Sequence, residues 1–352
     1  MKRPTMRQVA ALAGVGQKTV SRVINGEPHV SEQIQHRVRE AIAQLHYEPD
    51  IQAGNLKRRD RRTQSLGLLV GNMANPFSGA RHRALEAAAS PRGVDVYTSS
   101  LDDDPEREQR AVSSFLRRRV DGLVLMSFAQ KHSYLHITQQ RGTPIVFIDR
   151  VPTGIEADVV VSDNYGGARE AVRHLIETGH RRIAFVGDRE EAYTARERLR
   201  AFLDEIDAHG IPREEAVVVQ NLRDSHTAEL AVRELLEAER RPTAVFSAQN
   251  LVTLGTLRAL HGAGMQWDVA HVGFDDVQLA DILDPPLTVI AQDSHAIGAA
   301  AAELLFSRLD GNTGPTETVV IPTTLVVRGS GEIRPRTAAG PAVAPARERG
   351  AE

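Results

Sequence analysis

The stretch GVGQKTVSRVIN, residues 14–25, joins a Gly-x-Gly to a helical pattern whose polar side chains could perform recognition chemistry. A loop that cradles phosphate needs a preceding strand and further glycines, and this stretch has neither. Two interpretations remain, an ordinary solvent-exposed helix and a helix that binds DNA. In the second, Gln17, Lys18 and Arg22 could donate hydrogen bonds to base edges and phosphates.

A second group of polar side chains follows apolar segments later in the chain. Carboxylates, amides and guanidinium groups gather there around a phenylalanine, and they suit a polyhydroxylated ligand because each sugar hydroxyl both donates and accepts. These positions are Asn75, Phe77, Asp149, Arg150, Asn164, Arg196, Gln249, Asn250, Asp275 and Asp293, with Asp163, Asp276 and Gln292 beside them. Any one could instead cap a helix or form a surface ion pair, and for Asp163 and Asp276 that structural role is favoured.

Catalytic and metal-binding signatures are missing from the sequence. It contains no GxSxG, no HExxH and no complete Walker loop, and its 13 histidines form no i, i+4 pair beside a carboxylate. With no cysteine there is no disulfide, thiolate nucleophile or thiolate-bound metal. We therefore expect no enzyme activity, no cofactor and no metal. Without a signal peptide or a long apolar run, we also expect a cytoplasmic protein with no membrane partner.

The polar tip of residues 14–25 requires a supporting domain, and residues 1–49 predict one of three short helices. Thr5 and Gln8 form a capping box at the start of the first helix, and Ser31 can cap the third. The short turn between the first two helices is typical of a helix-turn-helix. Residues 1–62 carry twelve Lys or Arg against six Asp or Glu, while the remainder carries 31 against 40. This asymmetry favours a basic head that meets a polyanion, although a solubilising basic terminus would have the same charge.

The remaining elements predict a hinge, a body and a tail. Residues 50–62 form a short, weak helix with an interior glycine and a basic linker. In residues 63–330, apolar strands alternate with amphipathic helices, which predicts two doubly wound parallel-sheet subdomains that share a cleft. Expected strands are 65–70, 94–98, 122–127, 144–149, 182–187, 216–220, 244–248 and 269–274. Residues 331–352, rich in Ala, Pro, Gly and Arg, predict a disordered tail.

The sequence resembles the lactose/galactose repressor (LacI/GalR) family of bacterial transcription factors. In the head the resemblance rests on Thr5, Val9-Ala10, Ala13-Gly14-Val15, Thr19-Val20-Ser21-Arg22-Val23, Asn25, Val30-Ser31, Tyr47 and Pro49, without gaps. In the body it rests on ANPF, IDR, SDN, ETGHRRIAFVG, RERLRAF, GFDD, PPLTVI and QD. The resemblance implies a helix-turn-helix head and a body of periplasmic-binding-protein type.

The resemblance also implies roles in the head and hinge. Gln17, Lys18 and Arg22 would read bases, and Thr5, Thr19, Ser21 and Asn25 would position the recognition helix. Leu56 would wedge into the minor groove, with Ala53 as its neighbour. Packing of Leu56 on the body is the simpler alternative. Gly16 departs from the Ser or Ala usual in the family, and Gly54 should raise the cost of ordering the hinge.

In the body, the resemblance implies that Phe77, Asp149, Arg150, Asn164, Arg196, Asp275 and Asp293 touch a sugar or nucleobase effector. Three departures leave the ligand unnamed. Gln249-Asn250 stands where many relatives have Asn-Asp, no aromatic residue lies near Leu222–Arg223, and Ala291 replaces a commonly basic residue.

Together these features predict a DNA-binding transcriptional regulator, a repressor, controlled by a small molecule bound between the subdomains. It would bind a roughly palindromic operator as a homodimer, because two identical recognition helices require matching half-sites. The alternatives are control by a protein partner or a phosphorylated metabolite, and a solute-binding protein for uptake. The last has no use for the basic head and lacks an export signal.

Overall fold

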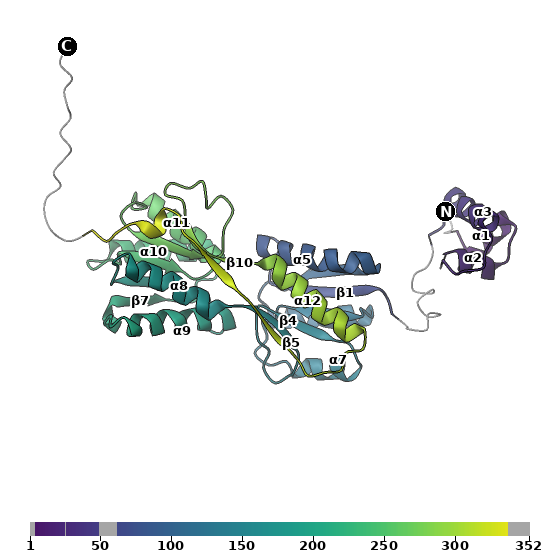
Figure 1. The fold of residues 1–352 in the computed structure, drawn as a ribbon, viewed down its shortest axis with the longest axis horizontal. Helices are drawn as coiled ribbons and strands as arrows, with labels where there is room; N and C mark the ends of the chain where they lie inside the picture. Colours follow the sequence, from purple (N-terminus) through teal and green to yellow (C-terminus); the bar gives the residue numbers. More distant parts are fainter. Residues whose placement is uncertain (1–3, 25, 49–61, 337–352) are drawn as a thin grey trace, which may run out of the picture. The chain divides into compact units, whose positions relative to one another are not determined.

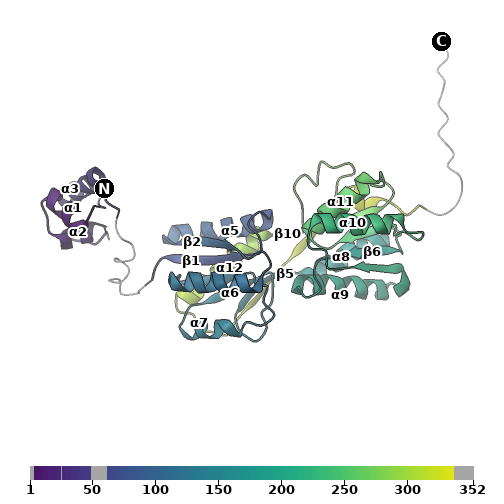
Figure 2. The same cartoon turned by 180° about the vertical axis from the view of Figure 1, so that it is seen from behind.

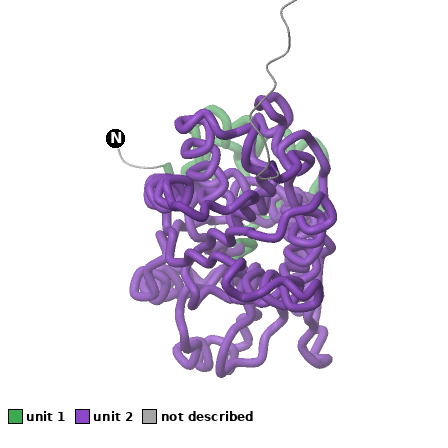
Figure 3. The backbone as a smooth tube through the Cα atoms, turned by 90° about the vertical axis from the view of Figure 1, so that its left-hand side faces the viewer, with its two compact units in different colours: residues 1–65 green, residues 66–352 purple. Residues whose placement is uncertain are grey.

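The computed structural model describes residues 4–24, 26–48 and 62–336, arranged as two compact units, 1–65 and 66–352 (Figure 3). Predicted site residues Asn25, Ala53 and Leu56 lie outside the described residues. Each unit has hydrophobic cores of its own.

The first unit is a bundle of three helices, α1 (Met6–Ala13), α2 (Gln17–Ile24) and α3 (Glu32–Leu45). Its core includes the fully buried Val9, Val20 and Val38, which lie on the apolar helix faces that the helical spacing predicts. The capping box is present at Thr5, but Ser31 stands at the N-cap of α3 without a side-chain capping bond, which corrects that expectation. Gly14 ends α1 in the left-handed region, where glycine avoids a side-chain clash.

The second unit contains two three-layer α/β subdomains, each with a six-stranded sheet (Figures 1 and 2). The first sheet runs β11 (Thr318–Ile321), β5 (Asp158–Ser162), β4 (Ile145–Ile148), β3 (Gly122–Leu125), β1 (Ser65–Val70), β2 (Asp95–Ser100). The second runs β12 (Thr323–Val326), β10 (Thr288–Gln292), β9 (Ala270–Phe274), β8 (Ala244–Ser247), β6 (Ile183–Val186), β7 (Ala216–Val219).

Helices cover both faces of each sheet, so the inner strands are buried, whereas the edge strands β2, β7, β11 and β12 are partly exposed. On the first sheet, α5 (Pro76–Ala89) and α12 (Ser294–Leu309) cover one face, and α6 (Pro105–Arg117) and α7 (His136–Gln140) lie on the other. On the second sheet, α8 (Asn164–Glu177) and α9 (Tyr193–Ala208) cover one face, and α10 (Ser225–Glu237) and α11 (Asn250–Gly262) cover the other. Short 3-10 turns occur at Ser90–Arg92, Ser133–Leu135, Arg213–Glu215 and Ser330–Glu332.

The eight expected strands are present, with ends that shift by a few residues, and four more were not predicted. The additional strands are β5, β10, β11 and β12, which flank the places where the chain crosses between subdomains. Because of these crossings, α8 packs in the second subdomain and α12 in the first. One pairing corrects the expectation of purely parallel sheets, since β12 runs antiparallel to β10.

The body extends beyond residue 330, where the sequence placed its end. The backbone N–H of Gly331 donates to Thr288 Oγ1 at 3.0 Å, and the Ile333 carbonyl lies 2.8 Å from Nε2 of the buried His180. Arg336 pairs with Asp268 at 2.7 Å. These contacts attach residues 331–336 to the second subdomain, and composition could not reveal them.

Candidate functional site

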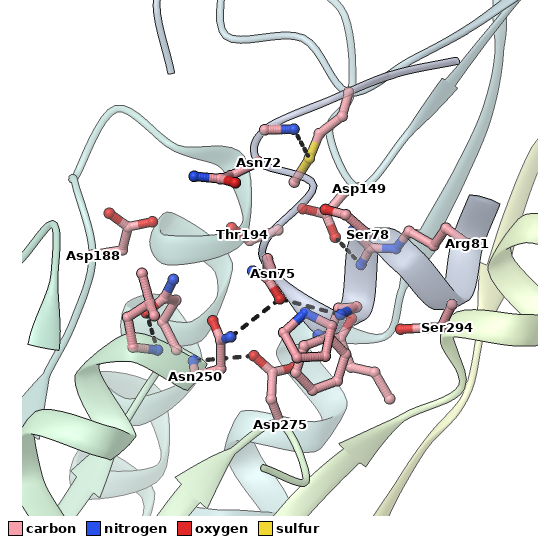
Figure 4. A pocket seen from close by; sticks show the side chains of 18 of the residues that line it. Asn72, Asn75, Ser78, Arg81, Asp149, Asp188, Thr194, Asn250, Asp275 and Ser294 are labelled. Atoms are coloured by element: carbon pink, nitrogen blue, oxygen red, sulfur yellow. Dashed lines mark hydrogen bonds and ion pairs between the residues drawn. The ribbon is translucent and has the colours of Figure 1, made fainter. Parts of the chain in front are cut away.

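A cavity of about 1010 Å³ lies between the subdomains at the carboxyl ends of their strands (Figure 4). The first subdomain contributes loops after β1, β2, β3 and β4, and the second contributes loops after β6, β7, β8 and β9. The charged residues that line it are Arg81, Asp102, Asp103, Asp149, Arg150, Asp188, Arg198, Arg223, Asp275 and Asp276. Such an arrangement fits the rule that open α/β sheets bind ligands beyond their carboxyl strand ends.

On the first wall, buried Arg81 on α5 donates from Nη2 to Asp149 Oδ1 at 3.0 Å. Asp149 directly follows β4 and has a φ of 67°. Its backbone N–H is held by the carbonyl of Val160 on β5 at 2.9 Å. The neighbouring strand therefore imposes this left-handed conformation, which directs the carboxylate toward the cavity.

Phe128, which follows β3, is one of two phenylalanines that line the cavity, together with Phe77. The guanidinium carbon of Arg150 stands 4.0 Å from the centre of the Phe128 ring, close enough for a cation–π interaction. Arg150 Nε is buried without a hydrogen-bond partner among the residues that the structure describes. Burial lowers the pKa of Arg150, while Asp149 and Asp103 oppose that shift. Because Arg150 lines the cavity, its guanidinium can donate hydrogen bonds to a ligand there.

On the second wall, Arg198 of α9 is buried and fixed by two hydrogen bonds. Nε donates to Asn164 Oδ1 at 2.8 Å, and Nη1 donates to the Ala248 carbonyl at 2.8 Å. The guanidinium carbon lies 3.6 Å from the centre of the Phe274 ring. Burial lowers the pKa of Arg198, and the nearby Asp275 carboxylate counteracts this effect.

Asp275, after β9, is the buried carboxylate of the second wall. It accepts from the Asn250 backbone N–H at 3.1 Å and from the Gln292 side chain. Burial raises the pKa of Asp275, and Arg198 opposes this rise. The carboxylate can accept hydrogen bonds from ligand hydroxyls at the cavity surface.

Two contacts join the walls across the cavity. Asn250 Nδ2 donates to Asn75 Oδ1 at 3.3 Å, and Arg189 forms an ion pair of 2.7 Å with Asp103. Burial raises the pKa of Asp103, whereas Arg189 lowers it. These bonds link loops of opposite subdomains, so movement between the subdomains must change them.

Most of the predicted ligand residues meet in this cavity. Its lining includes Asn75, Phe77, Asp149, Arg150, Gln249, Asn250 and Asp275. Two of them also have structural tasks, because Asn75 caps α5 and Gln249 caps α11 with their side-chain oxygens.

Three predicted ligand residues do not line the cavity. Arg196 is exposed and donates to the Glu191 carbonyl. Asn164 is buried behind the wall and holds Arg198, and Asp293 is exposed and caps α12 by accepting from Ala296 N–H at 2.8 Å. Asp163 caps α8 in the same way, and Asp276 pairs with Arg328 at 2.9 Å, as their structural roles predict.

Sequence reasoning missed Arg198, which a signal in the same motif could have found. On a helix, position 198 shares a face with Ala195, Ala201 and Phe202, all apolar and buried, whereas position 196 does not. Arg81 likewise lies on one face with Ala84 and Leu85. Phe128 and Asp103, by contrast, stand in loops where no periodicity marks them.

In the head, α2 presents the predicted DNA-contacting side chains. Gln17, Lys18 and Arg22 are exposed, and Thr19 and Ser21 are half-buried. Arg22 lies 3.5 Å from Glu27, and both side chains are largely solvent-accessible, so this weak pair does not prevent Arg22 from reaching a phosphate or base. Thr5 is engaged in its capping box.

None of the helices in the described ranges is both long and apolar enough to cross a membrane. Within those same ranges, no group of acidic and histidine side chains is arranged to hold a metal ion.

Comparison with known proteins adds the family context. Residues 5–50 match the family model "Bacterial regulatory proteins, lacI family", and residues 172–331 match "Periplasmic binding protein-like domain". The HTH-type transcriptional regulator CelR of Thermobifida fusca is 35% identical over 94% of this chain and 99% of its own. A structure of the lac repressor dimer bound to operator and the anti-inducer ONPF has a TM-score of 0.82 at 25% identity, covering 94% of this chain and 99% of that one. A CelR–cellobiose complex has a TM-score of 0.67 at 32% identity, covering 93% and 100%.

Proposed function

Because this chain belongs to the lacI family of bacterial regulatory proteins, a family of non-enzymatic transcriptional regulators, we propose how its parts divide the task. The head and hinge bind a specific operator, and the cavity between the subdomains binds a neutral carbohydrate that changes operator affinity. The observation that carries the second part is the lining of the cavity, where paired carboxylates and guanidinium groups stand around aromatic rings.

The hydrogen-bonding groups of the lining support a neutral ligand over a phosphorylated one. Six aspartates line the cavity against four arginines, and Asp149 and Asp275 already neutralise Arg81 and Arg198. A phosphate group offers only acceptors to these carboxylates, whereas sugar hydroxyls can accept from Arg150 and also donate to the aspartates. The cavity of about 1010 Å³ leaves room for more than one sugar ring. The cellobiose bound by the related CelR therefore makes a β-linked disaccharide the first candidate.

In the DNA-bound state, Gln17, Lys18 and Arg22 contact base edges. Thr5, Thr19, Ser21 and Asn25 hold the recognition helix on the phosphates. Leu56, with Ala53 beside it, enters the minor groove at the operator centre. The chain acts as a homodimer, so the operator is roughly palindromic.

An effector can change operator affinity only by binding one arrangement of the subdomains better than another. The contacts that join the walls, Asn250 to Asn75 and Arg189 to Asp103, are the bonds that such a change rearranges. An effector seated between them meets both subdomains at once, which supports control through the cavity.

A thermal-shift series tests the effector class, since a ligand of the folded state raises the unfolding midpoint. Cellobiose should raise the midpoint, glucose should raise it less, and glucose 6-phosphate should leave it unchanged. A shift with the phosphate ester alone would contradict the neutral-ligand proposal and favour a phosphorylated metabolite.

The DNA part of the proposal is tested by Leu56→Ala. This substitution should weaken binding to the specific operator far more than binding to random duplex, because the wedge acts only on the bent operator centre. Fluorescence anisotropy at matched salt measures both affinities. Equal losses on both duplexes would contradict the wedge role.

A further inference from the structure

A cluster of buried polar side chains lies inside the first subdomain, next to the cavity but outside its lining. It consists of Glu108 on α6, Ser127 after β3, and His132 and Tyr134 in the following loop, and is called the Glu108 cluster below. Glu108, Ser127 and His132 are at most 3% exposed. Burying a carboxylate costs free energy unless the group is fully hydrogen-bonded, so the burial of Glu108 requires a physical explanation.

Glu108 receives four hydrogen bonds and, within the described part of the chain, forms no ion pair with a lysine or arginine. Ser127 Oγ donates to Oε1 at 2.7 Å, and the Tyr134 hydroxyl donates to the same oxygen. The backbone N–H groups of Phe128 and Ala129 donate to Oε2 at 2.6 and 3.3 Å. Glu108 also lies near the start of α6, where the helix dipole favours a negative charge. Four donors and the dipole together explain how the carboxylate is buried.

His132 completes the cluster on its far side. Its Nε2 lies 2.6 Å from Ser127 Oγ, and its Nδ1 accepts from the Thr153 backbone N–H at 3.0 Å. Because the Ser127 hydroxyl hydrogen is directed at Glu108, its oxygen can accept from Nε2–H. The residues that flank Phe128 are thus tied to both α6 and the loop after β4.

Phe128 connects this cluster to the cavity. Its N–H makes the 2.6 Å bond to Glu108, and its ring is the surface on which Arg150 rests at 4.0 Å. On the opposite subdomain, Arg189 reaches within 5.7 Å of the same ring. One aromatic ring therefore contacts guanidinium groups from both walls, and its backbone is held by one buried carboxylate oxygen.

From this geometry we propose that Glu108 is a positioning residue of the effector site, which acts by fixing Phe128 and through it Arg150 and Arg189. The inference rests on the proposed function only in taking this cavity as the effector site. The length of the Glu108 side chain decides this role rather than its charge, because Oε2 must reach the backbone N–H of Phe128 to accept its hydrogen bond.

Two conservative variants separate the effect of side-chain length at position 108 from the effect of charge. Glu108→Gln keeps the length, and its amide oxygen can still accept from Phe128 N–H. Its NH₂ then faces the Ser127 and Tyr134 hydroxyls, which can rotate to accept. Glu108→Asp keeps the charge but withdraws it by one methylene, so the bond to Phe128 is lost. A role in charge or stability alone predicts that Glu108→Gln is the more damaging change, and positioning predicts the reverse.

Hydrogen–deuterium exchange of the full-length chain tests the positioning without any ligand. In Glu108→Asp, exchange at Phe128 and Ala129 should rise by about tenfold, the amount expected for losing a charge-assisted hydrogen bond. Exchange in the segments that carry Arg150 and Arg189 should rise with it. Glu108→Gln should stay within about threefold of wild type at all of these sites. A rise confined to residues 127–129 would overturn the proposal, as would a larger effect in Glu108→Gln.

Asp158→Ala provides the matched control, because Asp158 is another buried carboxylate of the same subdomain. It is held by Arg308 at 2.7 and 2.8 Å and by Glu317 N–H, at the start of β5 and away from the cavity. Its loss should lower the unfolding midpoint without raising exchange near Arg150. If the control raises exchange there as well, the effect is general destabilisation and the proposal is wrong.

Calorimetric titration with cellobiose adds the functional arm. Glu108→Asp should weaken cellobiose binding by about tenfold and Glu108→Gln by less than about threefold. If wild type binds no cellobiose, the proposed effector fails while the exchange result still decides the role of Glu108. If wild type binds and both variants bind equally well, Glu108 is not a positioning residue.

Discussion

The two subdomains place a carboxylate at the cavity from equivalent positions of their folds. Asp149 and Asp275 each follow the fourth strand of their subdomain with a positive φ, and each backbone N–H is held by the neighbouring strand at 2.9 and 2.8 Å. Asp163 and Asp293 each cap the helix after a crossing strand. Equivalent scaffolds thus aim equivalent carboxylates at one cavity from opposite sides.

The arginines beside these carboxylates differ in how they are held. Arg198 on the second wall donates hydrogen bonds to Asn164 and to the Ala248 carbonyl, so its guanidinium is fixed without a ligand. Arg150 on the first wall is stacked on Phe128, and its Nε has no partner in the described part of the chain. Arg198 is therefore held in place by more hydrogen bonds than Arg150, which leaves Arg150 the freer of the two guanidinium groups.

Among the substitutions considered, Arg198→Ala should have the largest effect on stability and on effector binding. The substitution leaves Asn164 Oδ1 and the Ala248 carbonyl without donors and Asp275 without its nearby cation, so the free energy of unfolding should fall by about 3 kcal/mol. Effector binding should weaken by at least about 100-fold. Urea unfolding and calorimetric titration measure the two effects.

Arg196→Ala is the matched control, two residues away on the same helix and exposed. It should retain both stability and effector response. A loss of response in Arg196→Ala with Arg198→Ala unaffected would mean that the wall has been assigned to the wrong arginine.

Arg150→Met should separate affinity from stability. Methionine keeps apolar contact with Phe128 but removes every donor, so effector affinity should fall by about tenfold. Stability should stay equal or rise, since no described residue accepts a hydrogen bond from the buried Arg150 Nε. Titration and unfolding of the same preparation measure both. A large loss of stability would show that Arg150, like Arg198, has a structural role.

A buried histidine of the second subdomain should make the stability of the protein depend on pH. In the second subdomain, His271 is buried beside Ser247 at 2.7 Å, and burial lowers the pKa of His271 from its ordinary 6.5 to about 3. As pH falls from 6.5 toward 3, the unfolded chain binds a proton that the folded chain excludes. Stability should therefore decrease over this range by up to about 1.4 kcal/mol per pH unit and stay constant above it.

His271→Gln should remove this contribution, so its unfolding free energy should change less than that of wild type between pH 6 and pH 5. The expected difference is about 1 kcal/mol. Urea unfolding of both proteins at the two pH values measures it. Parallel pH dependences would mean that His271 titrates alike in the folded and unfolded chains.

Local patterns in the sequence were sufficient for much of the fold. Helical spacing and a capping box determined the head, because three short helices can bury only the faces they present to one another. Apolar runs between amphipathic helices determined two buried sheets. Polar residues placed after such runs located the cavity, and most of those predicted line it, since the strand ends of a parallel sheet share one edge.

Tertiary structure alone decided how the subdomains interleave and which side chains face the ligand. The crossings after β5, β10 and β11 place α8 and α12 in opposite subdomains, and this pairing depends on contacts between residues far apart in the chain. The choice of Arg198 over Arg196 depends on the rotation of α9 about its axis, which packing against the sheet sets. The role of Glu108 depends on a loop 20 residues away that returns to its carboxylate. Sequence specifies the chemical groups, and long-range packing selects those that meet.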